Sequence, residues 1–443
     1  MKIHFIGIGG IGVSALARYY LQKGHRVSGS DLCQSEITKA LKKEGAEVFI
    51  GKHKAKNVKK DIDFLVYTLA TEKDNPELKK AKKLKIKCQT YPQALGEITK
   101  KYFTIAVSGT HGKSTTSSMV VILLKKAGLY PTFLIGTKLK EFGDKNCRVG
   151  KSNYLAIEAD EYGGAFLSYR PKVIILTSLE KEHLDYFKTE KRMFEVYKKY
   201  LGYLKNEKDG FLIYNRDDKN IRKIVKTLKF PSNKKKGYSR KEKRAQGIKK
   251  VLKVPGQHNV ANALGVLTLA EHLKIPEKTA LLALSSYKGS WRRFEVIPAR
   301  IKKKKYTLVS DYGHHPTEIK ATLQAAREKY KKKKIILVYQ PHQYQRTKVL
   351  FDDFVKSFDG VDSLILNEIY GVAGREENFS VSSKDIAQKV KKRWKGKKAV
   401  KFFKKQEDIL KELEKIIEKN NVLIVMGAGD IYNLTLKLTK KKK

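Results

Sequence analysis

A glycine-rich loop ending in Gly-Lys-Ser-Thr is the sequence feature that most constrains the fold of this chain. The loop, residues 109–115, follows an apolar run at 103–108 and precedes a helical pattern at 114–127. In a strand–loop–helix arrangement of this kind, the loop amides and the helix N-terminus bind phosphate groups together. The loop therefore predicts an α/β fold with an ATP site.

The residue types in this loop match the chemistry of such a site. We expect the Lys113 ammonium to reach the terminal phosphates and the Ser114 hydroxyl to ligate Mg²⁺. The usual eight-residue phosphate loop has glycine at the position of Val107, so this loop is a variant of that pattern. The candidate ATP-binding residues here are Gly109, Thr110, His111, Gly112, Lys113, Ser114 and Thr115.

A second glycine-rich loop lies near the beginning of the sequence. Gly7-x-Gly9-x-x-Gly12 follows an expected strand at 2–8, and Asp31 stands 19 residues after Gly12. In this context glycines let the backbone approach a pyrophosphate, and the acid binds a ribose hydroxyl. The loop predicts a nucleotide diphosphate as ligand, and taken alone it favours NAD or FAD.

Two nucleotide loops narrow the possible functions. A dinucleotide-dependent oxidoreductase would use the first loop but has no need of the second. A nucleic-acid-binding ATPase is the other alternative, because the formal charge of +50, from 95 basic and 45 acidic residues, attracts polyanions. The lysines lie in scattered runs without interleaved arginine and aromatic residues, so we interpret them as a solvated surface and predict no specific nucleic-acid partner.

The length of the chain requires several domains, because single cores stop growing near roughly 250–300 residues. Short apolar runs alternate with helical patterns through residues 2–68, again from 103 and again from 306. We expect an α/β protein with three domains in series. They are a Rossmann-like nucleotide-binding domain at 1–98, a central P-loop ATPase domain with a mostly parallel sheet at 99–296, and a C-terminal Rossmann-like α/β domain at 297–443. The stretch at 206–253 carries basic loops, and its secondary structure is the least predictable in the chain.

Cysteine usage and hydropathy indicate the compartment. Cys33, Cys88 and Cys147 are far apart without C-x-x-C spacing, which fits a reducing cytosol. The N-terminal apolar run contains the first glycine loop and no signal-peptide cleavage site, and other apolar runs are far shorter than the roughly 20 residues that span a bilayer. We expect a cytoplasmic protein without membrane insertion, either a monomer or a weak homodimer.

Further motifs occur in the same order as in the Mur ligases, and the chain resembles that family. Mur ligases are ATP-dependent enzymes of peptidoglycan synthesis. In addition to the 109–115 loop, the motifs are HFIGIGGIG at 4–12, SD at 30–31, EADE at 158–161, GQHNVANA at 256–263, RRF at 292–294, DYGHHPTE at 311–318 and QPH at 340–342. The resemblance extends over nearly the whole chain. It implies that the first domain binds a UDP-sugar, the central domain ATP and the third domain an amino acid.

The resemblance also implies a reaction. The carboxylate of UDP-N-acetylmuramate attacks the γ-phosphate of ATP, and the amine of L-alanine displaces the resulting acyl phosphate to form an amide bond. Two Mg²⁺ ions are expected, one held by Ser114 and Glu158 and the other by His183. The histidine ligand is implied by the resemblance alone, because magnesium usually prefers oxygen ligands. The implied catalytic residues are Lys113, Glu158, His183 and Arg293.

The other implied site residues fall into three groups. The UDP-sugar-binding residues are Gly7, Gly9, Gly10, Ile11, Gly12, Ser30 and Asp31. Asn259, Asn262, Arg293 and Asp311 complete the ATP site. Tyr312, His314 and Arg346 hold the amino acid, since an arginine fork suits its carboxylate.

Departures from the family pattern leave the amino-acid preference open. Ser178, Glu182 and Gln343 stand where the family usually has asparagine, aspartate and arginine. Glycine, serine or a preformed tripeptide are therefore alternative acceptors to L-alanine. Lys198, 15 residues after His183, has the spacing of a lysine that several Mur ligases carbamylate, but we interpret it as an ordinary exposed lysine.

Overall fold

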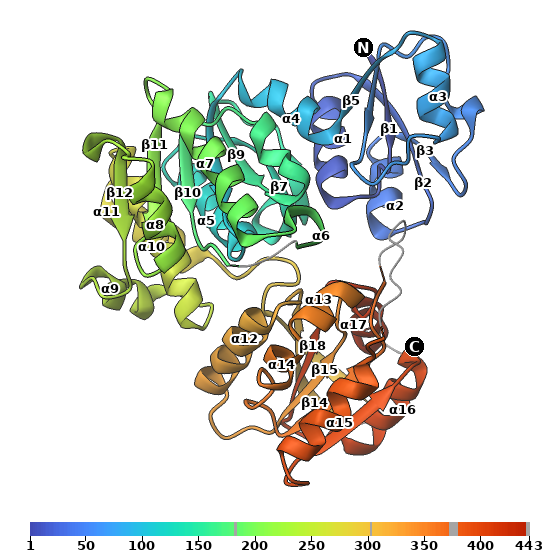
Figure 1. Ribbon diagram of the computed structural model, residues 1–443, viewed down its shortest axis with the longest axis vertical. Helices are drawn as coiled ribbons and strands as arrows, with labels where there is room; N and C mark the ends of the chain where they lie inside the picture. The colour runs from blue at the N-terminus through green and yellow to red at the C-terminus, as the bar shows by residue number, and fades with distance from the viewer. Residues whose placement is uncertain (181–183, 302–303, 372–379, 440–443) are drawn as a thin grey trace. The chain divides into compact units, whose positions relative to one another are not determined.

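The computed structural model describes residues 1–180, 184–301, 304–371 and 380–439, which form two compact units. The first unit comprises Met1–Leu252 and Val260–Tyr287, and the second comprises Lys253–Asn259 and Lys288–Lys443. Within the described residues, the first unit contains two sheets and the second contains one, each flanked by helices (Figure 1). The expected α/β architecture with three mostly parallel sheets in series is confirmed.

The first sheet has five parallel strands in the order β3-β2-β1-β4-β5. The elements around it are β1 (Lys2–Ile6), α1 (Ile11–Gln22), β2 (Arg26–Asp31), α2 (Glu36–Lys43), β3 (Glu47–Ile50), η1 (Ala55–Asn57), β4 (Phe64–Tyr67), α3 (Pro76–Lys83), β5 (Lys87–Thr90) and α4 (Tyr91–Thr99). The central strand β1 ends at Ile6, two residues earlier than expected, because Gly7 turns the chain with a φ of +78°.

Among the residues that the structure describes, the second sheet has seven strands in the order β12-β11-β10-β6-β9-β7-β8, and only the β7–β8 pair is antiparallel. Its first elements are β6 (Phe103–Ser108), α5 (Lys113–Lys126), β7 (Thr132–Leu139), η2 (Lys140–Phe142), β8 (Lys145–Arg148), β9 (Tyr154–Ala159), η3 (Tyr162–Ser168) and β10 (Val173–Leu176). Strand β6 lies in the middle of this sheet and is apolar over most of its length, as expected for a parallel strand that is covered on both faces.

Residues 206–253 contain helices and strands as well as basic loops, so this stretch is more regular than its sequence indicates. The second sheet continues through α6 (Leu184–Phe187), α7 (Glu190–Asn206), β11 (Phe211–Asn215), α8 (Lys219–Thr227), η4 (Ser232–Lys234), β12 (Lys235–Tyr238), α9 (Arg244–Val251), α10 (Gln257–His272) and α11 (Glu277–Ser286). Helix α8 buries Ile221, Ile224 and Val225 on one face. The intervening lysines hide this helical period in the sequence. Strand β12 is a short edge strand, where lysines are tolerated.

In the described part of the second unit, the third sheet has six strands in the order β13-β14-β18-β15-β16-β17, and only the β13–β14 pair is antiparallel. Its elements are β13 (Glu295–Ile301), β14 (Lys304–Asp311), α12 (Pro316–Lys329), β15 (Ile335–Tyr339), α13 (Tyr344–Val349), α14 (Phe351–Val355), β16 (Ser363–Asn367), α15 (Ser383–Arg393), β17 (Ala399–Phe403), α16 (Gln406–Ile416), β18 (Val422–Met426) and α17 (Tyr432–Thr439). Alternate residues of β15, such as Leu337 and Val338, enter separate cores on the two faces of this sheet.

The motifs follow the carboxyl ends of strands in all three sheets. The first glycine loop follows β1, the ATP loop follows β6, and the 311–318 motif follows β14. Open α/β sheets bind ligands at this edge. None of the helices in the described ranges combines the length and the apolarity that are needed to cross a membrane.

Candidate active site

Two glycines shape the ATP loop between β6 and α5. Gly109 and Gly112 have φ values of +131° and +84°, which residues with side chains rarely adopt. A Cβ atom at Gly109 would lie 2.4 Å from Oγ1 of Thr177, and one at Gly112 would lie 2.5 Å from Oδ1 of Asn262. The structure thus places Asn262, a predicted ATP-site residue on α10, directly against the loop.

The segment that follows β10 holds the loop in place. The Thr110 amide donates to the Ser178 carbonyl at 3.0 Å, and the His111 amide donates to the Ser178 hydroxyl at 2.8 Å. The Thr177 hydroxyl donates to the His111 carbonyl at 2.6 Å, and the Glu180 amide donates to the Thr110 hydroxyl at 2.9 Å. Ser178, which departs from the family pattern, therefore anchors the loop through both its backbone and its side chain.

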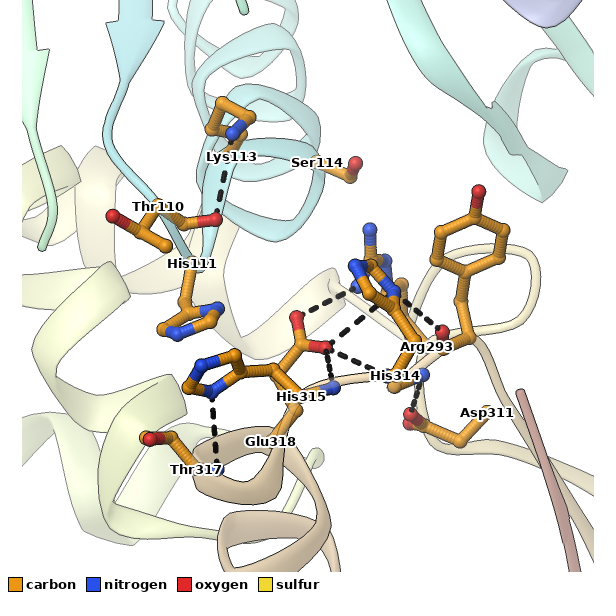
Figure 2. Close-up of polar contacts among 12 residues, drawn as sticks. Thr110, His111, Lys113, Ser114, Arg293, Asp311, His314, His315, Thr317 and Glu318 are labelled. Atoms are coloured by element: carbon orange, nitrogen blue, oxygen red, sulfur yellow. Dashed lines mark hydrogen bonds and ion pairs between the residues drawn. The ribbon is translucent and has the colours of Figure 1, made fainter. Parts of the chain in front are cut away.

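The Lys113 side chain folds back over the loop. Its ammonium donates to the Gly109 carbonyl at 2.7 Å and to the Glu161 carboxylate at 2.9 Å, and Figure 2 shows it also facing the Thr110 carbonyl at 3.4 Å. Burial by itself lowers the pKa of Lys113, but the carboxylates of Glu161 and Asp160 outweigh it and raise that pKa above its ordinary value. Lys113 is therefore a permanent cation, as phosphate binding requires.

Ser114 and Glu158 lie together beside the loop. The Ser114 hydroxyl donates to Oε2 of Glu158 at 3.0 Å, while Oε1 accepts from the Gly136 amide at 2.8 Å and the Ser117 hydroxyl at 3.3 Å. A hydroxyl and a carboxylate at this separation are the hard oxygen donors that Mg²⁺ prefers, so this pair fits the predicted metal role. Thr115, in the first turn of α5, is buried.

Two residues, His183 and Lys198, bear on the predicted second metal site, and the structure describes only Lys198. His183 lies outside the described residues, so the structure gives no account of it. Lys198 lies on α7 and is half-buried. The expected full exposure of Lys198 is therefore wrong, while its lack of a metal-bridging role remains a prediction.

The first glycine loop wraps around the carboxyl end of β2. The Gly7 and Ile8 amides donate to the Ser30 carbonyl at 2.8 and 3.0 Å, and the Gly9 amide donates to the Asp31 carboxylate at 2.8 Å. Ser30 and Asp31 thus shape the loop. Here Asp31 binds a loop amide, where the sequence pattern led us to expect a ribose contact.

The rest of this loop leads into α1. The Gly10 amide donates to the Gly7 carbonyl at 3.1 Å, and Gly10 is the N-cap residue of α1. Ile11 is the first residue of that helix. A Cβ at Gly12 would lie 2.9 Å from the Tyr91 ring, so α4 packs closely against this turn.

A buried carboxylate, Glu77, lies behind the first loop. Its oxygens are 3.0 Å from Nε2 of His4, 2.6 Å from the Ser30 hydroxyl and 2.7 Å from the Asn57 amide. Burial by itself raises the pKa of Glu77, but hydrogen bonds with His4, Ser30 and Asn57 lower it to about 2. The Ser30 hydroxyl thus faces inward, and Ser30 serves the loop through its backbone carbonyl.

Asp311 organises the start of the second unit's site. Its carboxylate accepts from the Phe294 amide at 2.8 Å and the Gly313 amide at 2.7 Å. Burial raises the pKa of Asp311 to about 6, although the nearby Arg293 guanidinium and the two amides act in the opposite direction. Phe294 itself has a positive φ of 48°, so the bonded carboxylate holds a strained backbone.

The predicted amino-acid residues gather in the second unit. The Tyr312 and His314 rings lie 5.5 Å apart between centroids, and the His314 and His342 rings lie 5.9 Å apart. The buried Arg346 guanidinium donates to the His342 carbonyl at 3.1 Å. Tyr312, His314 and Arg346 therefore form one cluster, which also contains His342.

Glu318 connects this cluster to Arg293. Figure 2 shows its carboxylate accepting from the amides of His314 at 2.8 Å and His315 at 3.2 Å, with the Arg293 guanidinium 3.9 Å away. Asn259, the other predicted residue on α10, donates its side-chain amide to the Pro255 carbonyl at 2.6 Å. That bond ties the first turn of α10 to the segment that precedes the helix.

Sequence reasoning missed several residues that organise these sites. They are Glu161, Thr177, Ser178, Glu318 and His342. Glu161, Glu318 and His342 lie inside motifs that the sequence analysis identifies. The motifs point to these residues, but the sequence does not show which groups they contact. Thr177 and Ser178 follow a predicted strand at its carboxyl end, which is a position that often contributes to binding sites.

Comparison with known proteins gives matches over almost the entire chain. Residues 2–103 match the family described as "Mur ligase family, catalytic domain", 107–270 match "Mur ligase middle domain", and 292–429 match "Mur ligase, glutamate ligase domain". The UDP-N-acetylmuramate–L-alanine ligase of Clostridium kluyveri is 39% identical over 98% of this chain and 96% of its own length. The corresponding enzyme of Caldanaerobacter subterraneus subsp. tengcongensis is 38% identical over 100% of this chain and 98% of its own.

Solved structures give the same result. The UDP-N-acetylmuramate–alanine ligase of Thermotoga maritima superposes with a TM-score of 0.81 and 29% identity, covering 99% of this chain and 98% of that one. A murein peptide ligase from Psychrobacter arcticus has a TM-score of 0.71 and the same coverage of the two chains, but at 21% identity it shows the shared fold alone.

The Gly112→Ala substitution tests the geometry of the ATP loop. We expect ATP affinity to fall at least about tenfold, because the new methyl group displaces Asn262 and the positive φ adds strain of about 1 kcal/mol. Gly128→Ala is the matched control, since its φ is also positive, at +76°, but nothing lies within 4 Å of the added Cβ. Calorimetric ATP titration should separate the two variants, and equal affinities would contradict this account of the loop.

The Glu77→Gln substitution tests the buried carboxylate. The pKa of Glu77 is about 2 in the folded protein against an ordinary value of 4.5, so its charge stabilises the fold above pH 4.5. This contribution is lost as the pH falls from 4.5 towards 2. We expect the free energy of urea unfolding to depend less on pH in the variant across that interval, and to be lower by about 2 kcal/mol at pH 7. An unchanged pH dependence would refute the assignment.

Proposed function

This chain belongs to the Mur ligase family, and from that premise we propose that it joins L-alanine to the carboxylate of UDP-N-acetylmuramate at the expense of ATP, in peptidoglycan synthesis. The relatives that carry this name match it over nearly their full length. The observation that best supports this chemistry is that the Lys113 ammonium and the Ser114–Glu158 pair both lie at one glycine loop. We place the enzyme in the cytoplasm.

Residues of the ATP loop assist the first step, in which the muramate carboxylate is phosphorylated. Lys113 exchanges its contacts with Glu161 and the loop carbonyls for the terminal phosphates of ATP, and its fixed charge lowers the repulsion that the attacking carboxylate meets. Ser114 and Glu158 would hold Mg²⁺, which neutralises further phosphate charge. The carboxylate oxygen of the muramate then bonds to the γ-phosphorus, and the bond to ADP breaks.

The second step uses the amino acid. Its neutral amine attacks the acyl carbon, the phosphate leaves, and the amine proton passes to solvent. We assign the Arg346 guanidinium to the alanine carboxylate, with Tyr312 and His314 beside it. By the family pattern, Arg293 contacts the nucleotide phosphates, Asp311 the ribose, and Asn259 and Asn262 the adenine region.

The first glycine loop binds the diphosphate of the UDP-sugar. The backbone of Gly7, Gly9 and Gly10 leads into the N-terminus of α1, where the amides of the first helical turn and the helix dipole favour an anion. A second Mg²⁺ held by His183 remains part of the proposal on family grounds alone.

Phosphate release decides between the candidate functions. We expect release to require UDP-N-acetylmuramate, Mg²⁺ and an amino acid together, with L-alanine preferred over glycine and serine, and with no response to a tripeptide acceptor. DNA and RNA should have no effect. Stimulation by nucleic acid without any response to UDP-N-acetylmuramate would overturn the proposal.

The Lys113→Ala substitution should abolish ligation while the protein stays folded, because the ammonium acts on phosphates at the edge of the sheet. Lys113→Met preserves the volume of the stem beside Glu161 and should be equally inactive. The control is Lys126→Ala, at the exposed end of the same helix. Circular dichroism should confirm folding, and substantial turnover in either Lys113 variant would contradict the assignment.

The Arg346→Ala substitution should raise the KM for L-alanine at least about tenfold and change the KM values for ATP and UDP-sugar much less, because a carboxylate clamp acts on one substrate. Arg346→Lys keeps the charge but loses the two-pronged geometry, so it should restore only part of the affinity. Equal weakening of all three substrates would instead indicate a folding defect.

A further inference from the structure

Asn146 on β8 is completely buried, yet its side chain bonds to the helix that begins at the first glycine loop. Its amide nitrogen donates to the Ile11 carbonyl at 2.7 Å and to the Ser14 hydroxyl at 3.1 Å. Its carbonyl oxygen accepts from the Arg18 guanidinium. All of these residues lie in the first unit, but Asn146 belongs to the second sheet and its three partners belong to α1.

The orientation of this carboxamide is determined by its partners. Arg18 can only donate and the Ile11 carbonyl can only accept, so the oxygen and the nitrogen of Asn146 cannot exchange places. Arg18 is itself held by the Glu44 carboxylate, which accepts from its Nε at 2.8 Å. A buried polar cluster with its partners satisfied in this way is rigid and specifies one arrangement of the elements that it joins.

The other side of β8 leads to the ATP site. Strand β8 pairs with β7, and Gly136 of β7 lies in the irregular part of that pairing. The Gly136 amide donates to Glu158, which in turn accepts from Ser114. A continuous series of bonded elements thus runs from Ile11, at the UDP-sugar loop, through Asn146 to the proposed magnesium ligands.

We propose that Asn146 is a positioning residue that fixes the UDP-sugar loop relative to the ATP loop. The muramate carboxylate must meet the γ-phosphate at attack distance, and a misplacement of about 1 Å can cost about 100-fold in rate. The buried carboxamide sets this separation because it is bonded to the first turn of α1, at the loop itself. This inference rests on the proposed function.

Two substitutions at this position test the proposal. Asn146→Leu keeps a similar volume and removes every bond to α1. Asn146→Asp keeps the oxygen that accepts from Arg18. It replaces the amide nitrogen with a second oxygen, and this oxygen and the Ile11 carbonyl oxygen repel each other. The Arg18→Met variant removes one of the three partners of Asn146 on α1.

The decisive measurement is single-turnover ADP formation from ATP and UDP-N-acetylmuramate without amino acid, which isolates the first chemical step. We expect both Asn146 variants to slow it about 100-fold. The Kd for ATP alone should stay within about threefold, because the ATP loop and its anchors at residues 177–180 are untouched. The double variant Asn146→Leu, Arg18→Met should lose little more than the worse single variant, since the two residues act through one cluster.

Asn367→Asp provides the matched control. Asn367 is also buried, and its amide donates to the carbonyls of Phe403 at 2.9 Å and Lys404 at 3.0 Å in the second unit. The same chemical change there should lower the melting temperature but leave the first-step rate close to that of the wild type.

The outcomes separate this inference from the proposed function. If wild-type protein forms no ADP in response to UDP-N-acetylmuramate, the proposed function fails. If the wild type responds but a folded Asn146→Leu variant reacts within about twofold of it, the positioning role is overturned. An equal loss of rate in Asn367→Asp would also overturn it, because it would show that general destabilisation slows the step.

Discussion

Lack of room for a side chain at Gly109 and Gly112 is the constraint on which the ATP site depends. Both glycines turn the chain through positive φ and pack against Thr177 and Asn262, so the loop lies tightly on its neighbours. This tight path brings the Lys113 ammonium back over the loop and places Ser114 beside Glu158. Lys113 and Ser114 therefore owe their positions to residues that have no side chain of their own.

The fold and the two glycine loops could be predicted because their signals are local. A strand, a glycine turn and a helix follow one another within about 30 residues, and the carboxyl ends of parallel strands lie at one edge of a sheet. The helices and strands within 206–253 could not be predicted, because lysines interrupt the apolar spacing of α8 and an edge strand needs little apolar pattern.

The detailed roles of predicted residues could not be derived in the same way. Ser30 and Asp31 were placed at the first loop by pattern, but the inward turn of the Ser30 hydroxyl depends on Glu77, which lies 47 residues away in the sequence. The contact between Asn146 and Ile11 spans 135 residues. Such partnerships come from packing, and a single sequence contains no local signal for them.

The large positive charge of the chain does not determine its buried chemistry. The acids Glu77, Glu158 and Asp311 each accept hydrogen bonds from nearby amides or hydroxyls, and Glu161 pairs with the loop lysine. Charges that are held by short, partly buried contacts are screened little by salt, whereas exposed lysines separated by more than the Debye length of about 8–10 Å hardly affect them. The lysine excess can therefore vary on the surface while the reactive groups keep their electrostatic environment. A net charge of +50 is for this reason compatible with a site that binds small anionic substrates through a few specific contacts.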